Sequence, residues 1–325
     1  MSLDFINTFT SIKEGIFGFT FWAAPDYFYN PVTGVLPILF RKEALLTVDE
    51  SFGSDDAAML DPVTRIGLMG TGATMFTYFL YHMQFHEDRD VRVFCRAKLF
   101  LALFRFAFLT YTLFSDESGV FVKETLAALA VCNLYSAIWL AAALWTTPVD
   151  PEMKNVKSTK REVLASLLSI TYVVPFALIM IAFTQELGPA GKLSFIKKTG
   201  TIDGQMGPSQ MFVFRLEGAC LANHLFLLVE VLLGFSKTII KLSLLGLSLF
   251  TTVLWTGAMD DSGFLDRKSY AVNFLFHAAI IVTLGKLVHG KTGKEDFATY
   301  QSKRDGSKDV PDLIPDIDNS KEKGD

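Results

Sequence analysis

Five side chains that can carry charge or form strong hydrogen bonds lie inside long apolar stretches of this chain. They are Arg105, Glu217, His224, Asn273 and His277. A charged group at the centre of a lipid bilayer costs about 2.5–3.5 kcal/mol on insertion scales, so it needs a partner or a function there. A guanidinium, a carboxyl and two imidazoles are groups that can hold a small anionic or amphiphilic solute. We therefore predict that these five residues bind a ligand.

Arg105 is expected to be the most costly of these residues to place in a membrane, because it lies near the middle of an apolar run, Leu101-Ala-Leu-Phe-Arg105-Phe. A basic side chain near a helix end reaches the membrane surface, whereas one at mid-depth does not. Arg105 is therefore expected to face the protein interior. Two interpretations stay open: it binds an anion or a ligand headgroup, or it forms a structural ion pair with Glu14, Glu217 or Glu230.

Among the long apolar stretches of the chain, 211–233 contains the most polar side chains. Glu217, Cys220, Leu221 and His224 follow helical spacing, so they are expected to share one face and to bring a carboxyl and an imidazole to one cavity. The alternative is that Arg215 pairs with Glu217. In a lipid-modifying enzyme, Glu217 and His224 would act as acid and base. No catalytic residue can be assigned from the sequence, and enzymatic activity stays uncertain.

Four further residues are secondary candidates: Arg65, Arg215, Asn133 and Glu230. Asn133 and Asn273 lie within apolar stretches, where amide side chains commonly join helices through hydrogen bonds. Packing is the alternative role for both.

A metal site is not predicted. His82 and His86 are spaced to lie on one helix face, which is a weak signal for a metal, but the chain contains only five histidines. Cys95, Cys132 and Cys220 fall in or beside apolar stretches and read as small apolar residues. No nucleotide-binding or hydrolase motif is present, and the sequence indicates no cofactor. A net charge of -4 provides no basic surface for nucleic acid.

The elements that must position these residues are membrane helices. A bilayer core about 30 Å thick requires about 20 mostly apolar residues in a helix. Seven stretches meet that length: 63–81, 97–114, 125–145, 163–183, 211–233, 237–255 and 270–287. An eighth, 5–24, contains Lys13 and Glu14, so hydropathy alone makes it an interfacial helix. The fold class is therefore all-α, a polytopic helix bundle whose partner is the lipid bilayer.

An internal repeat favours counting the eighth stretch as a crossing. Arg65-Ile-Gly67 opens one helix as Arg215-Leu-Glu-Gly218 opens another, Ser115-Asp-Glu-Ser-Gly119 resembles Met259-Asp-Asp-Ser-Gly263, and Asn133 corresponds to Asn273. We predict two tandem four-helix units: residues 1–148, with a long acidic loop at 25–62, and residues 149–289. The polar, charge-mixed segment 290–325 is predicted to be a disordered tail.

Loop charge predicts the orientation. With eight crossings, Lys and Arg concentrate in the loops of one side and Asp and Glu in those of the other, which places both termini on the cytoplasmic side. The loop 185–210 is the exception. Seven crossings would instead move the N-terminal segment outside. Which membrane holds the protein is not indicated.

Three functions fit these features. The first is binding or transport of a small anionic or amphiphilic solute between the two units, where related repeats often place their sites. The second is a non-catalytic subunit or scaffold of a larger membrane complex, holding lipid or pigment against 30 Phe and 4 Trp. The third is an intramembrane enzyme that modifies a lipid.

Overall fold

The computed structural model of this chain describes residues 2–29, 39–40, 60–84, 88–115, 119–147, 159–199, 204–232 and 239–289. Within these ranges the chain is helical and has no strand, although two isolated antiparallel β-bridges join Phe40 to Phe121 and Ile196 to Leu265. The elements are α1 Leu3–Ala23, α2 Pro25–Tyr29, α4 Pro62–Gln84, α5 Asp88–Ser115, α6 Lys123–Thr146, α7 Lys160–Ala182, the 3-10 turn η2 Thr184–Leu187, α8 Pro208–Leu232, α9 Ile239–Ala258 and α10 Arg267–His289.

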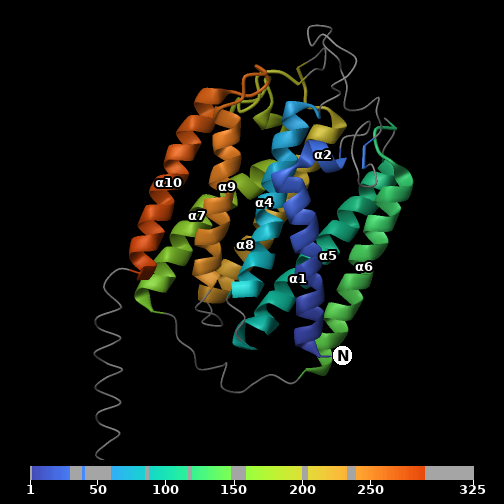
Figure 1. The fold of residues 1–325 in the computed structure, drawn as a ribbon, viewed down its shortest axis with the longest axis vertical. Helices are drawn as coiled ribbons and strands as arrows, with labels where there is room; N and C mark the ends of the chain where they lie inside the picture. The colour runs from blue at the N-terminus through green and yellow to red at the C-terminus, as the bar shows by residue number, and fades with distance from the viewer. Residues whose placement is uncertain are drawn as a thin grey trace, which may run out of the picture.

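The long helices run side by side along the length of the molecule (Figure 1). The long helices pack as four pairs of successive long helices: α1 with α4, α5 with α6, α7 with α8, and α9 with α10. Helix α4 also packs against α8 and α9, and α8 against α5, so α4 and α8 form the centre of the bundle. The start of α1 and the end of α10 lie at the same end of the molecule.

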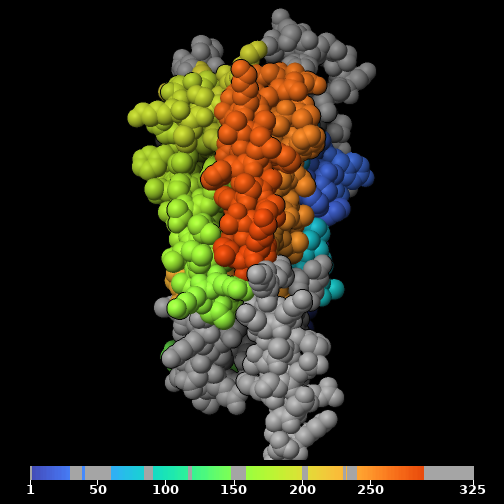
Figure 2. Space-filling model, turned by 90° about the vertical axis from the view of Figure 1, so that its left-hand side faces the viewer, coloured from blue at the N-terminus to red at the C-terminus, as the bar shows by residue number. Residues whose placement is uncertain are grey.

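Five helices, α6 to α10, are long and apolar enough to cross a membrane. The chain is therefore an all-helical, multi-pass membrane protein. Helix α10 is the least buried of the five. It exposes Val272, Leu275 and Phe276, and Figure 2 shows it on the outer face of the molecule between α7 and α9. Exposed apolar side chains of this kind are suited to contact lipid.

The apolar stretches in the sequence correspond to helices in the structure, with one difference in length. Helix α5 begins at Asp88, well before the predicted start at residue 97. Its polar first turns are held by Arg92, whose guanidinium donates to the carbonyl oxygens of Leu144 and Thr147 over 3.2 and 2.8 Å. Hydropathy could not find this extension because a tertiary contact stabilises it.

Helix α1 packs within the bundle, although hydropathy alone indicated an interfacial helix. Its polar residues Asn7, Ser11 and Glu14 are buried and face α5. Polar groups on this helix are thus paired inside the protein, and its apolar residues, such as Phe9 and Ile16, face outward.

Glycines allow α4 to approach two neighbours closely. A Cβ atom on Gly72 would lie 2.3 Å from the backbone nitrogen of Trp22 on α1, and one on Gly67 would lie 2.4 Å from Cγ2 of Val213 on α8. Glycines at these positions thus permit close helix packing.

Aspartates cap two helices at the same end of the bundle. Asp61 accepts from the backbone N–H of Thr64 over 3.0 Å and from the Gln210 side chain over 2.7 Å, which ties α4 to α8. Burial raises the pKa of Asp61, while those hydrogen bonds oppose the shift. Asp266 precedes α10 and accepts from the Ser269 hydroxyl over 2.6 Å. This bond, together with the Lys197 ammonium 3.1 Å away, holds the pKa of Asp266 below its usual range.

The lowered pKa of Asp266 predicts how its contribution to stability depends on pH. The Asp266 carboxylate stabilises the folded state above the unfolded pKa of about 3.9, and this contribution is lost as the pH falls through the lower folded pKa. The thermal midpoint of Asp266→Asn should therefore lie below that of the wild type at pH 7, and the two should converge at strongly acidic pH. Asp261→Asn is the matched control, because Asp261 pairs with Arg267 over 2.8 Å but its side chain is 87% exposed. An Asp266→Asn difference that is the same at pH 7 and pH 3 would contradict the prediction.

The predicted disordered tail, 290–325, lies outside the described residues. So does most of the acidic loop predicted at 25–62, since only 25–29, 39–40 and 60–62 of it are described.

Candidate functional site

Glu217 lies at the crossing of α8 and α4. It is 2% exposed, and a Cβ atom on Gly70 would lie 2.4 Å from its Oε1 atom, so the absence of a side chain on Gly70 makes room for the carboxyl. In the described part of the chain, no residue forms a hydrogen bond or an ion pair with this carboxyl. A buried carboxyl without a partner is expensive, which makes Glu217 a functional candidate on structural grounds.

Two small cavities adjoin each other beside α8. The first, of about 40 Å³, is lined by Glu217 with Tyr270 and Phe195, and the second, of about 50 Å³, is lined by His224 with Tyr78 and Thr74. Both are also lined by the same four side chains, Phe176, Met180, Phe250 and His277. The cavities thus lie between α4 on one side and α7 to α10 on the other.

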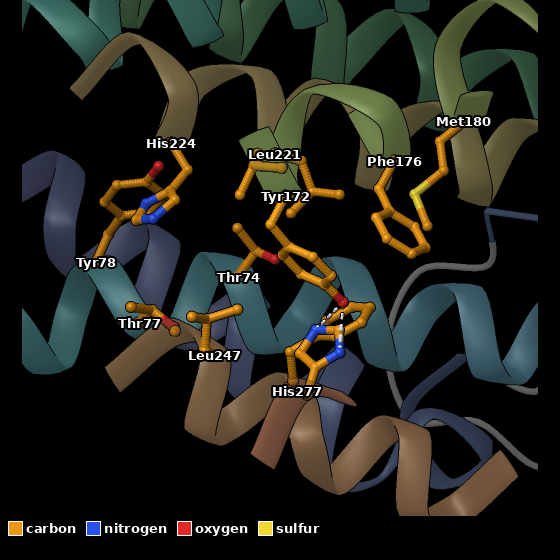
Figure 3. A pocket seen from close by; sticks show the side chains of 13 residues that line it. Thr74, Thr77, Tyr78, Tyr172, Phe176, Met180, Leu221, His224, Leu247 and His277 are labelled. Carbon is orange, nitrogen blue, oxygen red and sulfur yellow. Dashed lines mark hydrogen bonds between the residues drawn. The ribbon is translucent and has the colours of Figure 1, made fainter. Parts of the chain in front are cut away.

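His277 joins the two cavities and is held in place by three contacts. The Tyr172 hydroxyl lies within hydrogen-bond distance of both ring nitrogens, 2.7 Å from Nε2 and closer to Nδ1. The Nδ1 atom also lies 3.1 Å from the Asn273 carbonyl oxygen, and the ring stacks on Phe250 with centroids 5.4 Å apart. A ring that donates from Nδ1 to the carbonyl and accepts at Nε2 from the hydroxyl satisfies both polar contacts. Figure 3 shows the Tyr172 hydroxyl directed at the His277 ring.

His224 lies away from that pair in the lining of the larger cavity (Figure 3). It is buried, and no described residue is hydrogen-bonded to it. The preceding residue, Asn223, donates from its amide to the Tyr78 hydroxyl over 2.9 Å and so links α8 to α4 beside the cavity. His224 therefore presents a free imidazole to an otherwise mostly apolar space.

Arg105 lies apart from these cavities. Its Nη1 atom donates to both carboxylate oxygens of Glu14, over 2.7 and 2.9 Å, and its Nη2 atom donates to Cys220 Sγ over 3.2 Å. Of the two interpretations of Arg105, the structure thus contains the ion pair, with Glu14 as the partner. Of the five residues predicted to share one site, Glu217, His224 and His277 lie around the adjoining cavities. Asn273 does not line them and donates to the Ser269 carbonyl of its own helix.

The proposed pairing of Arg215 with Glu217 is wrong. Residues two apart on a helix point to different sides, and no ion pair joins these two. The predicted shared face of α8 is also divided, since Glu217, Leu221 and His224 line the cavities whereas Cys220 contacts Arg105.

The secondary candidates lie elsewhere. Arg65 pairs with Asp26 over 3.0 Å near one end of the bundle. Asn133 donates to the Leu129 carbonyl over 2.8 Å. The side chain of Glu230 is outside the described part of the structure. His82 contacts the Asn7 amide over 3.2 Å, and His86 is not among the described residues. In the ranges given above, no three His, Cys, Asp or Glu side chains gather to hold a metal ion.

The sequence interpretation missed Lys98 and Tyr172. Lys98 occupies the second position of the predicted stretch 97–114, where hydropathy sets the membrane boundary, whereas in the longer helix α5 it is buried beside α1. Tyr172 lies among apolar residues of α7, and its type alone gave no signal. Only the tertiary structure brings its hydroxyl to His277.

Comparison with known proteins adds no identification. No protein-family model matches the chain. No curated protein and no solved structure shows significant similarity to it.

Proposed function

We propose that this multi-pass membrane protein binds or translocates a small amphiphilic solute in the adjoining cavities between α4 and helices α7 to α10. The observation that carries the proposal is that Glu217 and His224 are both buried, face these cavities and have no partner among the described residues. Ionisable groups that a membrane protein keeps at mid-depth without a structural partner are typical of solute and proton pathways.

The lining indicates the chemistry of the solute. Phe176, Met180 and Phe250 offer an apolar wall, whereas Glu217, His224 and His277 offer hydrogen bonds. An uncharged carboxyl is the form that such a site accommodates at least cost, so Glu217 would donate a hydrogen bond. A solute with an apolar body and a hydrogen-bonding head fits these cavities better than a fully hydrated anion. Each cavity has room for only a few atoms, so the solute must be small or must displace the shared side chains.

The proposal includes two tandem four-helix units that cross the membrane eight times. Pairing α1–α4–α5–α6 with α7–α8–α9–α10 matches every helix contact of the first set to one in the second, whereas the α8–α9 contact of the second set has no counterpart of similar size between α4 and α5. The loops provide independent support. Gly119 and Gly263 both have a positive φ, the residue two positions later forms a β-bridge, and a helix starts four positions later at Lys123 and Arg267.

This helix register would align one lining residue of the polar pocket with one lining residue of the cavities. Aligning Lys123 with Arg267 makes Asn133 correspond to His277. The sequence repeat instead matched Asn133 to Asn273, which lies one helical turn earlier. Asn133 lines a polar pocket between α1, α5 and α6, while His277 lines the cavities between α4 and helices α7 to α10. In this alignment the first unit would contain a charged pocket and the second would contribute most of an aromatic one. Such divergence supports a specialised role for the second.

The other two functions stay predictions. Within the enzyme hypothesis, Glu217 and His224 would have to act together, yet they line different cavities and form no hydrogen bond with each other. The complex-subunit hypothesis would be supported by an exposed surface that contact with lipid does not explain. The exposed apolar side chains of α10 suit lipid as well as they suit a protein partner.

A cavity-filling substitution tests the proposal. Gly246 lines the larger cavity, and a Cβ atom there would meet only Thr77, at 3.4 Å, so Gly246→Met should extend into the cavity and exclude the solute. Gly285→Met on α10 is the matched control, because a Cβ atom there meets nothing within 4 Å. Native mass spectrometry after mild detergent extraction should detect a bound small molecule in the wild type and in Gly285→Met but not in Gly246→Met.

Two outcomes would overturn the proposal. One is that the wild type carries no small molecule. The other is that both variants retain it equally. Copurification of stoichiometric protein partners in its place would favour the subunit hypothesis.

A further inference from the structure

A polar pocket lies between α1, α5 and α6, and it shares no lining residue with the cavities of the proposed function. Lys13 and Glu14 on α1, Lys98 and Arg105 on α5, and Asn133 and Ser136 on α6 line it. These residues fall in the middle of their helices, so the pocket is near mid-depth in the bundle. A concentration of four ionisable side chains at this depth requires an explanation.

The charges in this pocket do not balance. Glu14 forms hydrogen-bonded ion pairs with Arg105, and the Lys13 ammonium lies 3.7 Å from Glu14 Oε1. Lys98 is 6% exposed, and its ammonium donates only to neutral oxygens, at 3.0 Å to the Asn7 carbonyl, 2.7 Å to Asn7 Oδ1 and 2.5 Å to Ser11 Oγ. Three basic side chains thus meet one carboxylate among the described residues.

Cys220 does not remove this imbalance. Its sulfur accepts from Arg105 over 3.2 Å, and even a full thiolate would leave one positive charge uncompensated. An uncompensated charge away from water is strongly unfavourable, whereas a counter-charge in hydrogen-bond contact offsets much of that penalty. The missing component of the pocket is therefore negative.

The space that remains is small. The cavity has a volume of about 10 Å³, which accommodates one particle about the size of a water molecule. Ser136 donates its hydroxyl proton to the Cys132 carbonyl over 2.8 Å and accepts from Lys13 over 3.2 Å, and the three N–H groups of Lys98 are matched by its three acceptors. The Lys13 ammonium and the buried Nε atom of Arg105, which has no partner among the described residues, are the donors that remain for a ligand. The buried Oδ1 atom of Asn133 has no partner among the described residues, and as an acceptor it cannot donate to an anion, so the cationic side chains must supply the contacts.

We propose that this pocket binds one small monovalent inorganic anion of halide size, held by hydrogen bonds from Lys13 and Arg105 and by the positive charge of Lys98 beside it. The site is independent of the proposed solute cavities, so either can fail without the other. The anion neutralises the excess positive charge between α1, α5 and α6 and so fixes these helices together.

Chloride is the probe for the test. The full-length protein in detergent should retain radioactive chloride (³⁶Cl⁻) at about one ion per chain, and its thermal midpoint should rise by several degrees when chloride replaces gluconate at constant ionic strength. Lys98→Met should abolish chloride retention. Lys268→Met, which removes an exposed lysine at the start of α10, is the control with the same change in net charge and should retain chloride as the wild type does.

Asn133→Asp separates an anion site from a purely structural cluster. The new carboxylate would sit at the pocket and replace the anion, so the variant should have a higher midpoint than the wild type in gluconate, and its midpoint should not respond to chloride. A structural cluster without excess charge predicts the opposite, a lower midpoint in both salts, because an additional buried charge would be unpaired. The proposal is overturned if the wild type retains no chloride, if Lys98→Met retains it, or if Asn133→Asp is less stable than the wild type in gluconate.

Discussion

Glu14→Gln is expected to destabilise the folded protein by about 3–5 kcal/mol, because removing one partner of a buried ion pair leaves the opposite charge uncompensated. Glu14 is the carboxylate that faces Arg105, Lys13 and Lys98, so its loss leaves three basic groups together. Arg105→Met should be less harmful, since Glu14 would still have the Lys13 ammonium 3.7 Å away. Urea or thermal unfolding in a fixed detergent measures the difference.

The double variant Glu14→Gln/Arg105→Met provides the control. It removes one negative and one positive group and should be more stable than Glu14→Gln alone, because one of the stranded cations is gone. The prediction is contradicted if the two single variants lose the same free energy of unfolding and the double variant loses the sum of the two. The three cations would then not need Glu14 as their counter-charge.

Gly72→Ala is expected to cost about 3 kcal/mol, at the upper end for inserting a methyl group into a packed interior. The new Cβ would lie 2.3 Å from the Trp22 nitrogen and 2.6 Å from the Gly18 oxygen, and both are backbone atoms that cannot rotate away. Helix α1 would have to move off α4. Gly285→Ala should be neutral or stabilising by up to about 1 kcal/mol, because alanine is the better helix former and the added methyl meets nothing. Similar midpoints for the two alanine variants would contradict the close contact of α1 with α4.

Much of the fold could be predicted because membrane helices follow from the length of apolar stretches. The same rule identified Glu217, His224 and His277, since an ionisable group in such a stretch stands out by residue type alone. It could not show which of these groups meet. The partner of Arg105 is Glu14, 91 positions away, and nothing local distinguishes Glu14 from Glu217 or Glu230.

The errors have equally specific causes. The pairing of Arg215 with Glu217 relied on proximity in sequence, whereas the direction of a side chain on a helix decides which residues meet. Lys98 was overlooked because hydropathy places the membrane boundary where the apolar residues begin, and α5 extends beyond that point into contact with α6. Tyr172 became relevant only through a contact with a helix more than a hundred positions later.

The burial of Asn7, Ser11 and Glu14 on α1 has a consequence for synthesis of the protein. While the ribosome produces the chain, the first helix emerges long before α5, and its polar groups then lack Lys98 and Arg105. A segment with that composition is poorly suited to integrate into the bilayer by itself. We therefore expect the nascent first helix to rest at the membrane surface and to integrate only when α5 arrives, so that topogenesis of this end is a cooperative event between the two segments.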